Sequence, residues 1–322
     1  MVLRLPRFLR VSLGLALAAL VVGLPAAPAA ASATAAPVRA VAGSAGAVQV
    51  PVLMYHYIRV NPIASDRYGA DLSVTPAHFA AQMRLLATHG FHPISLQQLA
   101  DAFLYGTALP SRPVVLSFDD GYADFYTAAY PILQAWGFRA TSFIITGKVG
   151  WGGYLTWAQM RQMQASGLID FESHTVNHVE LGLIALSRAQ YEMQTSKAVL
   201  EAQLGRPIRF LCYPSGSYSY AVEQAAAADG YVAAFTTQPG SWESAGTRFA
   251  LPRVRIHGST TLAGFAWLVG TRVRAADYST ATPAPARATS PAPVQAAGRA
   301  PAAPTPVPAG GSGMPVRAYA AP

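Results

Sequence analysis

The sequence of 322 residues predicts an α/β fold in which a parallel sheet closes into a barrel. Short apolar runs typical of buried strands alternate with segments of helical period, and strict alternation of this kind favours parallel strands joined by helices. About seven such repeats follow one another, fewer than the eight of a complete barrel. Polar residues that could act as catalytic groups or metal ligands stand directly after two of the strands, where α/β barrels assemble their active sites.

The expected elements follow one another along the chain. After the first strand comes a polar, Gly-containing stretch at 61–73, of the sort that forms a loop over a site. Thr75 as N-cap and Pro76 in the first helical position begin a helix that ends at Gly90, and Ser95 caps a second helix. Strands are expected at 48–54, 114–118, 140–145, 168–171, 208–211, 231–235 and 254–256, and further helices at 96–104, 124–136, 157–164 and 188–204, before 229 and through 265–268.

The stretch at 114–121 is a short apolar run that ends in two adjacent carboxylates and a glycine. Because side chains on a strand alternate between faces, Asp119 and Asp120 point differently and can have different roles. One can bind a metal ion while the other stays free as a base. A turn that merely ends a strand is the simpler interpretation of such a tripeptide taken alone, so its partners elsewhere in the chain decide.

Those partners are His174 and His178, which follow the strand at 168–171. A spacing of four residues places two imidazoles on one helical face or in one tight turn, where both can reach one cation. Asp120, His174 and His178 then form a set of two imidazoles and one carboxylate. The set favours one divalent ion, Zn²⁺ by preference, with Co²⁺, Ni²⁺ or Mn²⁺ as alternatives. Asp119 is left as the general base.

Residues 117–121 and 174–178 resemble the first two motifs of the polysaccharide deacetylases with a NodB-type catalytic domain, carbohydrate esterase family 4. These motifs are Thr/Ser-Phe-Asp-Asp-Gly and His-Ser/Thr-x-x-His. The resemblance runs from near Val50 to near Val273. It implies a distorted (β/α)7 barrel and a metal-dependent hydrolase that removes acetyl groups from a polysaccharide.

Two histidines compete for the role of general acid, which protonates the leaving amine. His56 stands in Met-Tyr-His, which is similar to the permuted arrangement of the poly-N-acetylglucosamine deacetylase subgroup. His257 follows Ile256 and partly resembles the late Leu/Ile-x-His motif of other members. The better match and the position at a strand end favour His56, and His257 is the alternative acid.

The third motif departs from the family pattern. The usual Arg-x-Pro-Tyr-Gly is replaced at 211–216 by Leu-Cys-Tyr-Pro-Ser-Gly, so the arginine that would orient the base carboxylate is absent there. Arg253 or Arg209 could substitute, and the sequence does not decide between them.

Several residues are expected to line the substrate site. Tyr213 and Pro214 suit a rigid loop beside a sugar, and the backbone N–H of Tyr213 is the expected oxyanion donor. Tyr122, Trp151 and Trp157 offer stacking faces for a sugar, although packing explains each of them equally well.

The remaining organisation follows from composition. Residues 1–33 have the basic start, apolar stretch and small-residue exit of a secretory signal peptide, with an uncleaved anchor as the alternative. We expect a linker at 34–47, the catalytic domain at 48–274, and a disordered Pro/Ala-rich tail at 275–322. The only cysteine, Cys212, excludes an intramolecular disulfide and suits a small buried residue.

The sequence therefore predicts a secreted or cell-wall-associated enzyme that removes N-acetyl groups from an N-acetylglucosamine-containing polysaccharide, such as an exopolysaccharide, peptidoglycan or a chitin-like polymer. The net charge of +8 comes without a basic stripe interleaved with aromatics, so nucleic acid is not expected as a partner. We expect a monomer with no membrane span after signal cleavage. The alternatives are an O-deacetylase of a polymer such as xylan and an inactive glycan-binding relative.

Overall fold

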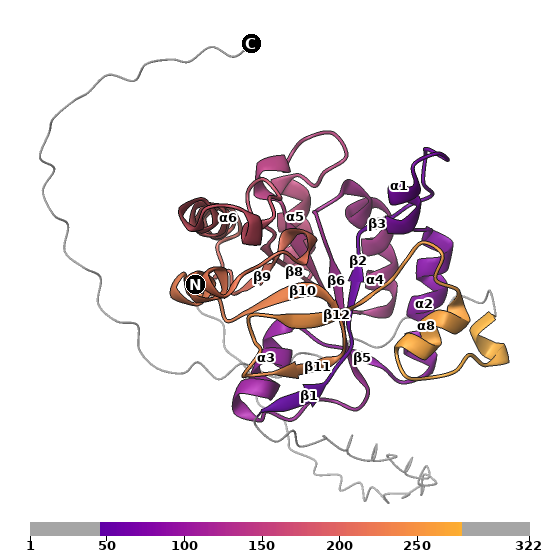
Figure 1. The fold of residues 1–322 in the computed structure, drawn as a ribbon. Coiled ribbons are helices and arrows are strands. Elements are labelled where there is room, and N and C mark those ends of the chain that lie inside the picture. Colours follow the sequence, from indigo (N-terminus) through magenta and orange to yellow (C-terminus); the bar gives the residue numbers. More distant parts are fainter. Residues whose placement is uncertain (1–45, 279–322) are drawn as a thin grey trace, which may run out of the picture. The chain divides into compact units, whose positions relative to one another are not determined.

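The computed structural model describes residues 46–278, which form the predicted barrel. Seven parallel strands close a ring in the order β2, β12, β10, β9, β8, β7, β6 and back to β2 (Figure 1). A short eighth strand, β5 (His92–Pro93), pairs with β6 outside the ring. The ring strands are β2 Val52–Tyr55, β6 Pro113–Phe118, β7 Ala140–Ile144, β8 Ile169–Ser173, β9 Phe210–Cys212, β10 Ala233–Pro239 and β12 Leu251–Arg255.

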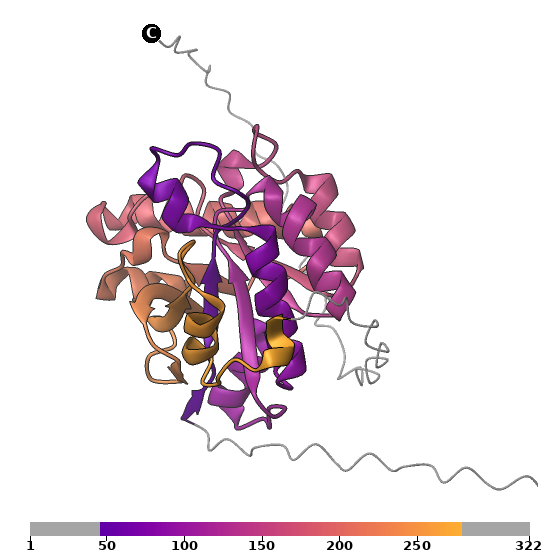
Figure 2. The same cartoon turned by 90° about the vertical axis from the view of Figure 1, so that its right-hand side faces the viewer.

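Helices surround this ring and close its floor. Figure 2 shows α2 and α8 beside each other on one flank, where they are in contact. Helix α3 lies under the barrel against two short strands, β1 (Ala47–Gln49) and β11 (Trp242–Ser244). The helices are α1 Arg67–Leu72, α2 Pro76–Thr88, α3 Leu96–Tyr105, α4 Tyr130–Trp136, α5 Trp157–Ala165, α6 Leu186–Leu204, α7 Tyr220–Ala228 and α8 Leu262–Leu268, with a π-helical turn, η1 Phe125–Ala129, before α4.

The predicted helix starts are confirmed. Thr75 accepts a hydrogen bond from the backbone N–H of His78, with Pro76 in the first helical position. Ser95 forms a capping box with Gln98, in which each side chain accepts from the other residue's backbone N–H. Local capping chemistry was therefore sufficient to place these two helices.

Strand side chains divide into two apolar layers because successive residues face opposite sides of the sheet. In β6, Val115 belongs to the cluster that fills the barrel interior and floor, whereas Val114 and Leu116 belong to the cluster between barrel and helices. Asp119 follows two residues after Ser117 and continues the inward face. Its carboxylate therefore enters the upper end of the barrel interior.

The single first strand predicted at 48–54 is wrong. The segment forms two strands, β1 pairing antiparallel with β11 on the floor and β2 pairing in the ring. Pro51 stands between them and has no N–H to donate, while the N–H of Val50 turns to the carbonyl of Ser241. Val48, Val50 and every residue of β2 are buried on either side of the break, so hydrophobicity alone does not show it.

The predicted loop at 61–73 also contains regular structure. Helix α1 is capped by Asp66, whose side chain accepts from the N–H of Gly69 at 2.8 Å. A two-residue strand, β4 (Ser73–Val74), then pairs with β3 (Tyr57–Ile58). These elements are too short to show an apolar period, which explains why the sequence suggests only a loop.

The seam between β8 and β9 is closed largely by one side chain. The two strands share a single register pair, Ser173 with Leu211. Glu172 accepts hydrogen bonds from the N–H groups of Arg209 and Phe210, both at 2.8 Å. Its other oxygen accepts from Arg206 at 2.8 Å. A carboxylate thus replaces part of the backbone ladder, and this is one source of the distortion of the barrel.

The predicted signal peptide, most of the linker and nearly all of the tail lie outside the described residues. The predicted start of the disordered tail at 275 is wrong, because Ala275–Tyr278 form a short 3-10 helix in which the buried Asp277 accepts a hydrogen bond from Thr88 and pairs with His89 at 2.9 Å. None of the helices between residues 46 and 278 combines the length and the apolar character that crossing a bilayer requires.

Glu243 is a buried carboxyl residue in the floor of the barrel, and it should make the stability of the protein depend on pH. It is fully buried opposite Val48, neither carboxyl oxygen has a hydrogen-bond partner among the described residues, and burial raises its pKa to about 9. The folded chain therefore retains a proton that the unfolded chain releases above about pH 4.5, so stability falls as the pH rises between these values. One such group changes the free energy of unfolding by about 1.4 kcal/mol per pH unit.

We expect Glu243→Gln to lose less stability than the wild type between about pH 5 and about pH 8 in urea unfolding. Glu180→Gln, at an exposed position, is the control and should follow the wild-type pH dependence. Parallel curves for the wild type and Glu243→Gln would contradict the pKa shift.

Candidate active site

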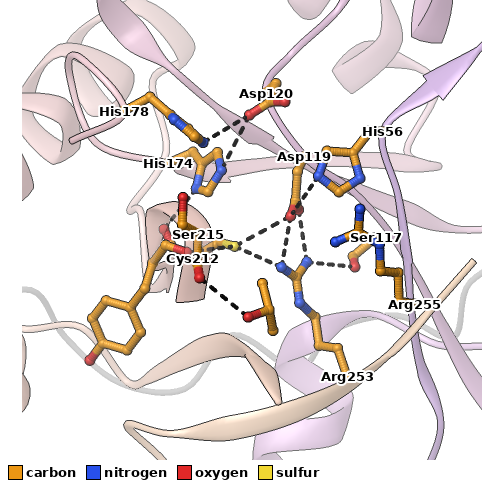
Figure 3. Close-up of polar contacts among 12 residues, drawn as sticks. His56, Ser117, Asp119, Asp120, His174, His178, Cys212, Ser215, Arg253 and Arg255 are labelled. Atoms are coloured by element: carbon orange, nitrogen blue, oxygen red, sulfur yellow. Dashed lines mark hydrogen bonds and ion pairs between the residues drawn. The ribbon is translucent and has the colours of Figure 1, made fainter. Parts of the chain in front are cut away.

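The candidate residues come together at the carboxyl end of the barrel strands (Figure 3). His56 follows β2, the two aspartates follow β6, and His174 follows β8. Carboxyl ends of parallel strands meet at one rim, so residues distant in the sequence become neighbours. The sequence motifs therefore converge because of strand topology.

Asp120, His174 and His178 form a compact group of three donor atoms. Asp120 Oδ1 lies 3.4 Å from His174 Nε2 and 3.3 Å from His178 Nε2, and all three atoms lie within 4.8 Å of one another. The buried Asp120 Oδ1 has no hydrogen-bond partner in the described part of the chain. This group has the composition of a divalent-metal site with two imidazoles and one carboxylate.

The backbone of β9 orients one of these imidazoles. His174 Nδ1 lies 2.7 Å from the carbonyl oxygen of Cys212, which can only accept a hydrogen bond. The ring proton therefore sits on Nδ1, and in the neutral ring Nε2 turns a lone pair toward Asp120. Two lone pairs that face each other at this distance repel unless a proton or a cation lies between them. The donor set therefore fits a divalent cation, with the Cys212 carbonyl as the outer support that such histidines usually have.

Electrostatics at the group also suit a cation. Burial lowers the pKa of His178, and the adjacent His174 lowers it further. Burial raises the pKa of the Asp120 carboxyl, but the neighbouring His174 outweighs this and holds it below its usual value. The group thus offers an ionised carboxylate and a neutral His178 imidazole near neutral pH, whereas the pKa of His174 is raised, so a cation that binds there would displace a proton from this ring.

The two histidines lie in a turn, the second of the two arrangements that the sequence allowed. Thr175 and His178 both have positive φ, at 67° and 58°, and the N–H of His178 donates to Thr175 Oγ1 at 3.0 Å. Asp120 and Ser215 are also in the left-handed region, at 73° and 56°. Such residues cost roughly 1–3 kcal/mol each and persist only where the surroundings enforce them.

Arg253 holds Asp119 inside the barrel. Its Nη1 donates to Asp119 Oδ1 and its Nη2 to Asp119 Oδ2, both at 2.7 Å. The remaining donors reach Ser117 Oγ at 3.3 Å, Cys212 Sγ at 3.0 Å and the Thr236 carbonyl at 2.9 Å. All five N–H groups of the buried guanidinium are therefore used. Burial alone would raise the pKa of the Asp119 carboxyl, but the charge and hydrogen bonds of Arg253 hold it far below its usual value.

The structure distinguishes the two arginines that the sequence left open. Arg209 is exposed, precedes β9 at the amino end of the strands, and donates to Gln97 at 3.1 Å. Arg253 is the residue that contacts Asp119. A strand-parity argument could have found it, because Leu251 and Arg253 alternate with Pro252 and Val254 along β12 and share the inward face.

Of the two candidate general acids, His56 is the one that lies near Asp119. Its Nε2 is 3.9 Å from Asp119 Oδ2, and its side chain is 14% exposed. His257 instead contacts Asp71 Oδ1 through Nδ1 at 2.8 Å and is 46% exposed. Burial lowers the pKa of His56 below its ordinary value of 6.5, although the charge of Asp119 opposes the shift. Figure 3 also shows Arg255, the last residue of β12, beside His56.

The expected oxyanion donor is engaged elsewhere. The N–H of Tyr213 donates to the carbonyl of Phe235 at 3.0 Å, so it is not free to bind an oxyanion in this structure. Pro214 follows it as a buried residue and has no N–H. Any oxyanion donor must therefore come from another group.

The aromatic residues near the site have different exposures. Tyr122 packs against Tyr57, with ring centroids 3.6 Å apart, and against Tyr154 at 5.2 Å. These contacts leave little of its faces for a sugar. Trp157 packs against the core between barrel and helices, whereas Trp151 is 62% exposed. Trp151 is thus the one of the three expected aromatics with a face that is open to solvent.

Cys212 contributes more than the sequence suggested. Beyond filling space, its Sγ contacts Arg253 and lies 3.6 Å from Asp119 Oδ2, and its carbonyl orients His174. The signal was present in the sequence, because Cys212 stands where the family motif has its arginine.

Comparison with known proteins agrees with this geometry. The sequence profile of the family described as polysaccharide deacetylase matches residues 106–234. A protein of Bacillus subtilis (strain 168) named as a polysaccharide deacetylase, YxkH, is 35% identical over 209 residues, which are 65% of this chain and 71% of that protein. The chain belongs to the polysaccharide deacetylase family. Its resemblance at the two motifs is thereby confirmed.

Two further relatives of this deacetylase are informative. The solved structure of the Streptococcus pyogenes deacetylase PplD in complex with acetate has 33% identity and a TM-score of 0.65, covering 69% of this chain and 98% of that one. The poly-β-1,6-N-acetyl-D-glucosamine N-deacetylase of Staphylococcus aureus (strain MSSA476) is 29% identical over 175 residues, which are 49% of this chain and 58% of that protein. The chain therefore spans little more than half of this second relative.

The Arg253 contact generates a prediction. Arg253→Lys keeps a positive charge but cannot form the bidentate pair, so Asp119 should lose its fixed orientation. Misplacing a catalytic group in this way can cost roughly 10²-fold in rate. We expect a comparable loss of acetate release with the bound metal retained, measured together with metal content. Arg209→Lys is the matched control and should keep the wild-type rate; equal effects of the two changes would contradict the assignment.

Proposed function

We propose that this deacetylase removes N-acetyl groups from an N-acetylglucosamine-containing polysaccharide with the help of one divalent metal ion, zinc by preference. The observation that carries the proposal is that His56, and not His257, lies at Asp119 beside the group of Asp120, His174 and His178. This is the arrangement that the early Met-Tyr-His motif implied. The relative named as a poly-β-1,6-N-acetyl-D-glucosamine N-deacetylase supports the same substrate class.

The proposed roles follow from position. Asp120, His174 and His178 would hold the cation, which supplies a Lewis acid for the acetyl carbonyl and lowers the pKa of water. Asp119 accepts the proton of the attacking water, and Arg253 keeps its carboxylate ionised and in place. His56 then donates a proton to the nitrogen of the leaving amine.

Because His56 and Asp119 lie close together, both proposed proton transfers, from the water to Asp119 and from His56 to the amine, can take place at one site. Because burial lowers the pKa of His56, its proton is weakly held and readily given to an amine. Asp119 contributes a fixed negative charge at 3.9 Å that stabilises the protonated imidazole. The two residues therefore act as a pair.

We further propose export to the cell exterior or cell wall. The support is the signal-peptide pattern at 1–33, with a linker at 34–47 and the catalytic domain at 48–274. The tail beyond residue 278 is proposed to take no part in the chemistry, because its composition cannot bury enough apolar surface to join a core.

Acetate release from a panel of polymers tests the function. We expect release from poly-N-acetylglucosamine, chitin oligomers or peptidoglycan, its loss after chelation, and its recovery with about one equivalent of Zn²⁺. Acetylxylan is the control substrate. Release from acetylxylan alone would indicate an O-deacetylase, and full activity after verified metal removal would exclude the metal mechanism.

Substitutions of the two adjacent aspartates should have different effects in the same assay. Asp119→Asn should retain the metal and lose roughly 10²–10⁴-fold in turnover, which is the usual worth of general-base catalysis. Asp120→Asn should lose both metal and turnover. Near-normal rates for Asp119→Asn would show that the proton is accepted elsewhere.

The general acid is tested by His56→Ala with His257→Ala as its control. We expect His56→Ala to retain the metal and lose roughly 10²–10⁴-fold in turnover, whereas His257→Ala is nearly silent. An acid must be protonated, so the wild-type rate should fall as the pH rises through the pKa of His56, and this limb should flatten in His56→Ala. A rate that instead rises through that pKa would make His56 the base.

A further inference from the structure

The turn that carries His174 and His178 is bound from outside the barrel by Glu192, a fully buried residue of helix α6. The N–H groups of Val176 and Asn177 both donate to Glu192 Oε2, at 3.0 and 2.8 Å. The Asn177 side-chain amide donates to Oε1 at 2.9 Å. Helix α6 packs on β8 beside α5 (Figure 1), so it places this carboxylate directly behind the turn.

The conformation of the turn explains why it needs such a partner. Thr175 and His178 are both left-handed, which is unfavourable for residues other than glycine. Between them, the successive N–H groups of Val176 and Asn177 converge on one point. Consecutive N–H groups of this kind form a concave anion site. Here the anion is the Glu192 carboxylate, which offsets the strain of the turn.

The neighbouring contacts show that Glu192 acts through the turn. Arg188, one helical turn earlier, donates to Oε1 at 2.8 Å and neutralises the buried charge. Each carboxylate oxygen thus accepts two hydrogen bonds, from Arg188 and the Asn177 amide on Oε1 and from two backbone N–H groups on Oε2. These four bonds use the accepting capacity of the carboxylate. Glu192 is therefore directed at the ligand-bearing turn and not at the donor atoms themselves.

We propose that Glu192 is a positioning residue that sets the metal affinity of the site without contacting the metal. It holds Val176 and Asn177, so His178 is delivered to Asp120 at the distance observed. The inference rests on the metal-dependent function proposed above. Outer partners that orient ligands typically contribute 10–100-fold to metal affinity.

The test measures Zn²⁺ affinity of the metal-free protein by calorimetry, together with the melting temperature of the metal-free form. Glu192→Gln preserves the volume of the side chain but replaces one acceptor oxygen by an NH₂ group that faces other donors. Glu192→Ala removes every contact. We expect the Zn²⁺ dissociation constant to rise by roughly 10–100-fold in both variants.

Glu201→Ala is the matched control on the same helix. Glu201 also accepts a backbone N–H, from Ile208 at 3.0 Å, and pairs with Lys197, but its contacts lie away from the turn. We expect it to lower the melting temperature while leaving Zn²⁺ affinity unchanged. An equal loss of affinity in Glu201→Ala would attribute the effect to general weakening of α6 and overturn the proposal.

The remaining outcomes separate the two proposals. Wild-type affinity in Glu192→Gln and Glu192→Ala would overturn the positioning role while leaving the function intact. Absence of Zn²⁺ binding by the wild type itself would overturn the proposed function, and the positioning role with it. If Glu192→Ala does not fold, Glu192→Gln decides the question alone.

Discussion

The buried ion pair between Arg253 and Asp119 is the interaction on which the site is built. Taking two charges out of water is unfavourable unless their remaining hydrogen-bonding groups are also satisfied. Here the guanidinium donates to Ser117, which lies in β6, and to Asp119, which follows this strand. It also donates to Cys212 Sγ in β9 and to the Thr236 carbonyl in β10. The pair thus joins four strands at the upper end of the barrel interior. Removing one partner from such a pair typically costs 3–5 kcal/mol, because it leaves a buried charge without compensation.

Because of this ion pair, the two adjacent aspartates have different surroundings. Asp119 follows the inward face of β6 and is held by Arg253, whereas Asp120 is turned by its positive φ toward the imidazoles of His174 and His178. One carboxylate is therefore fixed by a cation of the protein, and the other is left with a buried oxygen that faces two nitrogen donors. Two adjacent carboxylates can face such different partners only because the backbone changes direction between them.

Arg253 reaches Asp119 from a different strand than the third motif of the family implies. The third motif of the family carries its arginine on the segment that here contains Cys212. In this chain the small thiol occupies that place, and the guanidinium reaches the same carboxylate from β12 and contacts the sulfur at 3.0 Å. A larger side chain at 212 would crowd the guanidinium, because Cys212 Sγ already lies 3.0 Å from Arg253 Nη2. The carbonyl of Cys212 still orients His174, so the imidazole keeps its support whatever side chain stands at 212.

The sequence by itself determined the alternation of strands and helices and the helix caps at Thr75 and Ser95. It also determined the two motifs that contain Asp119, Asp120, His174 and His178. Each of these depends on neighbours within a few residues. The tertiary structure decided the rest. It separated β1 from β2 at Pro51, selected Arg253 over Arg209, brought His56 rather than His257 to Asp119, and engaged the N–H of Tyr213 in the sheet. These outcomes depend on which strand ends meet at the rim and which side chains face inward, and contacts between residues so distant along the chain leave no local pattern in the sequence.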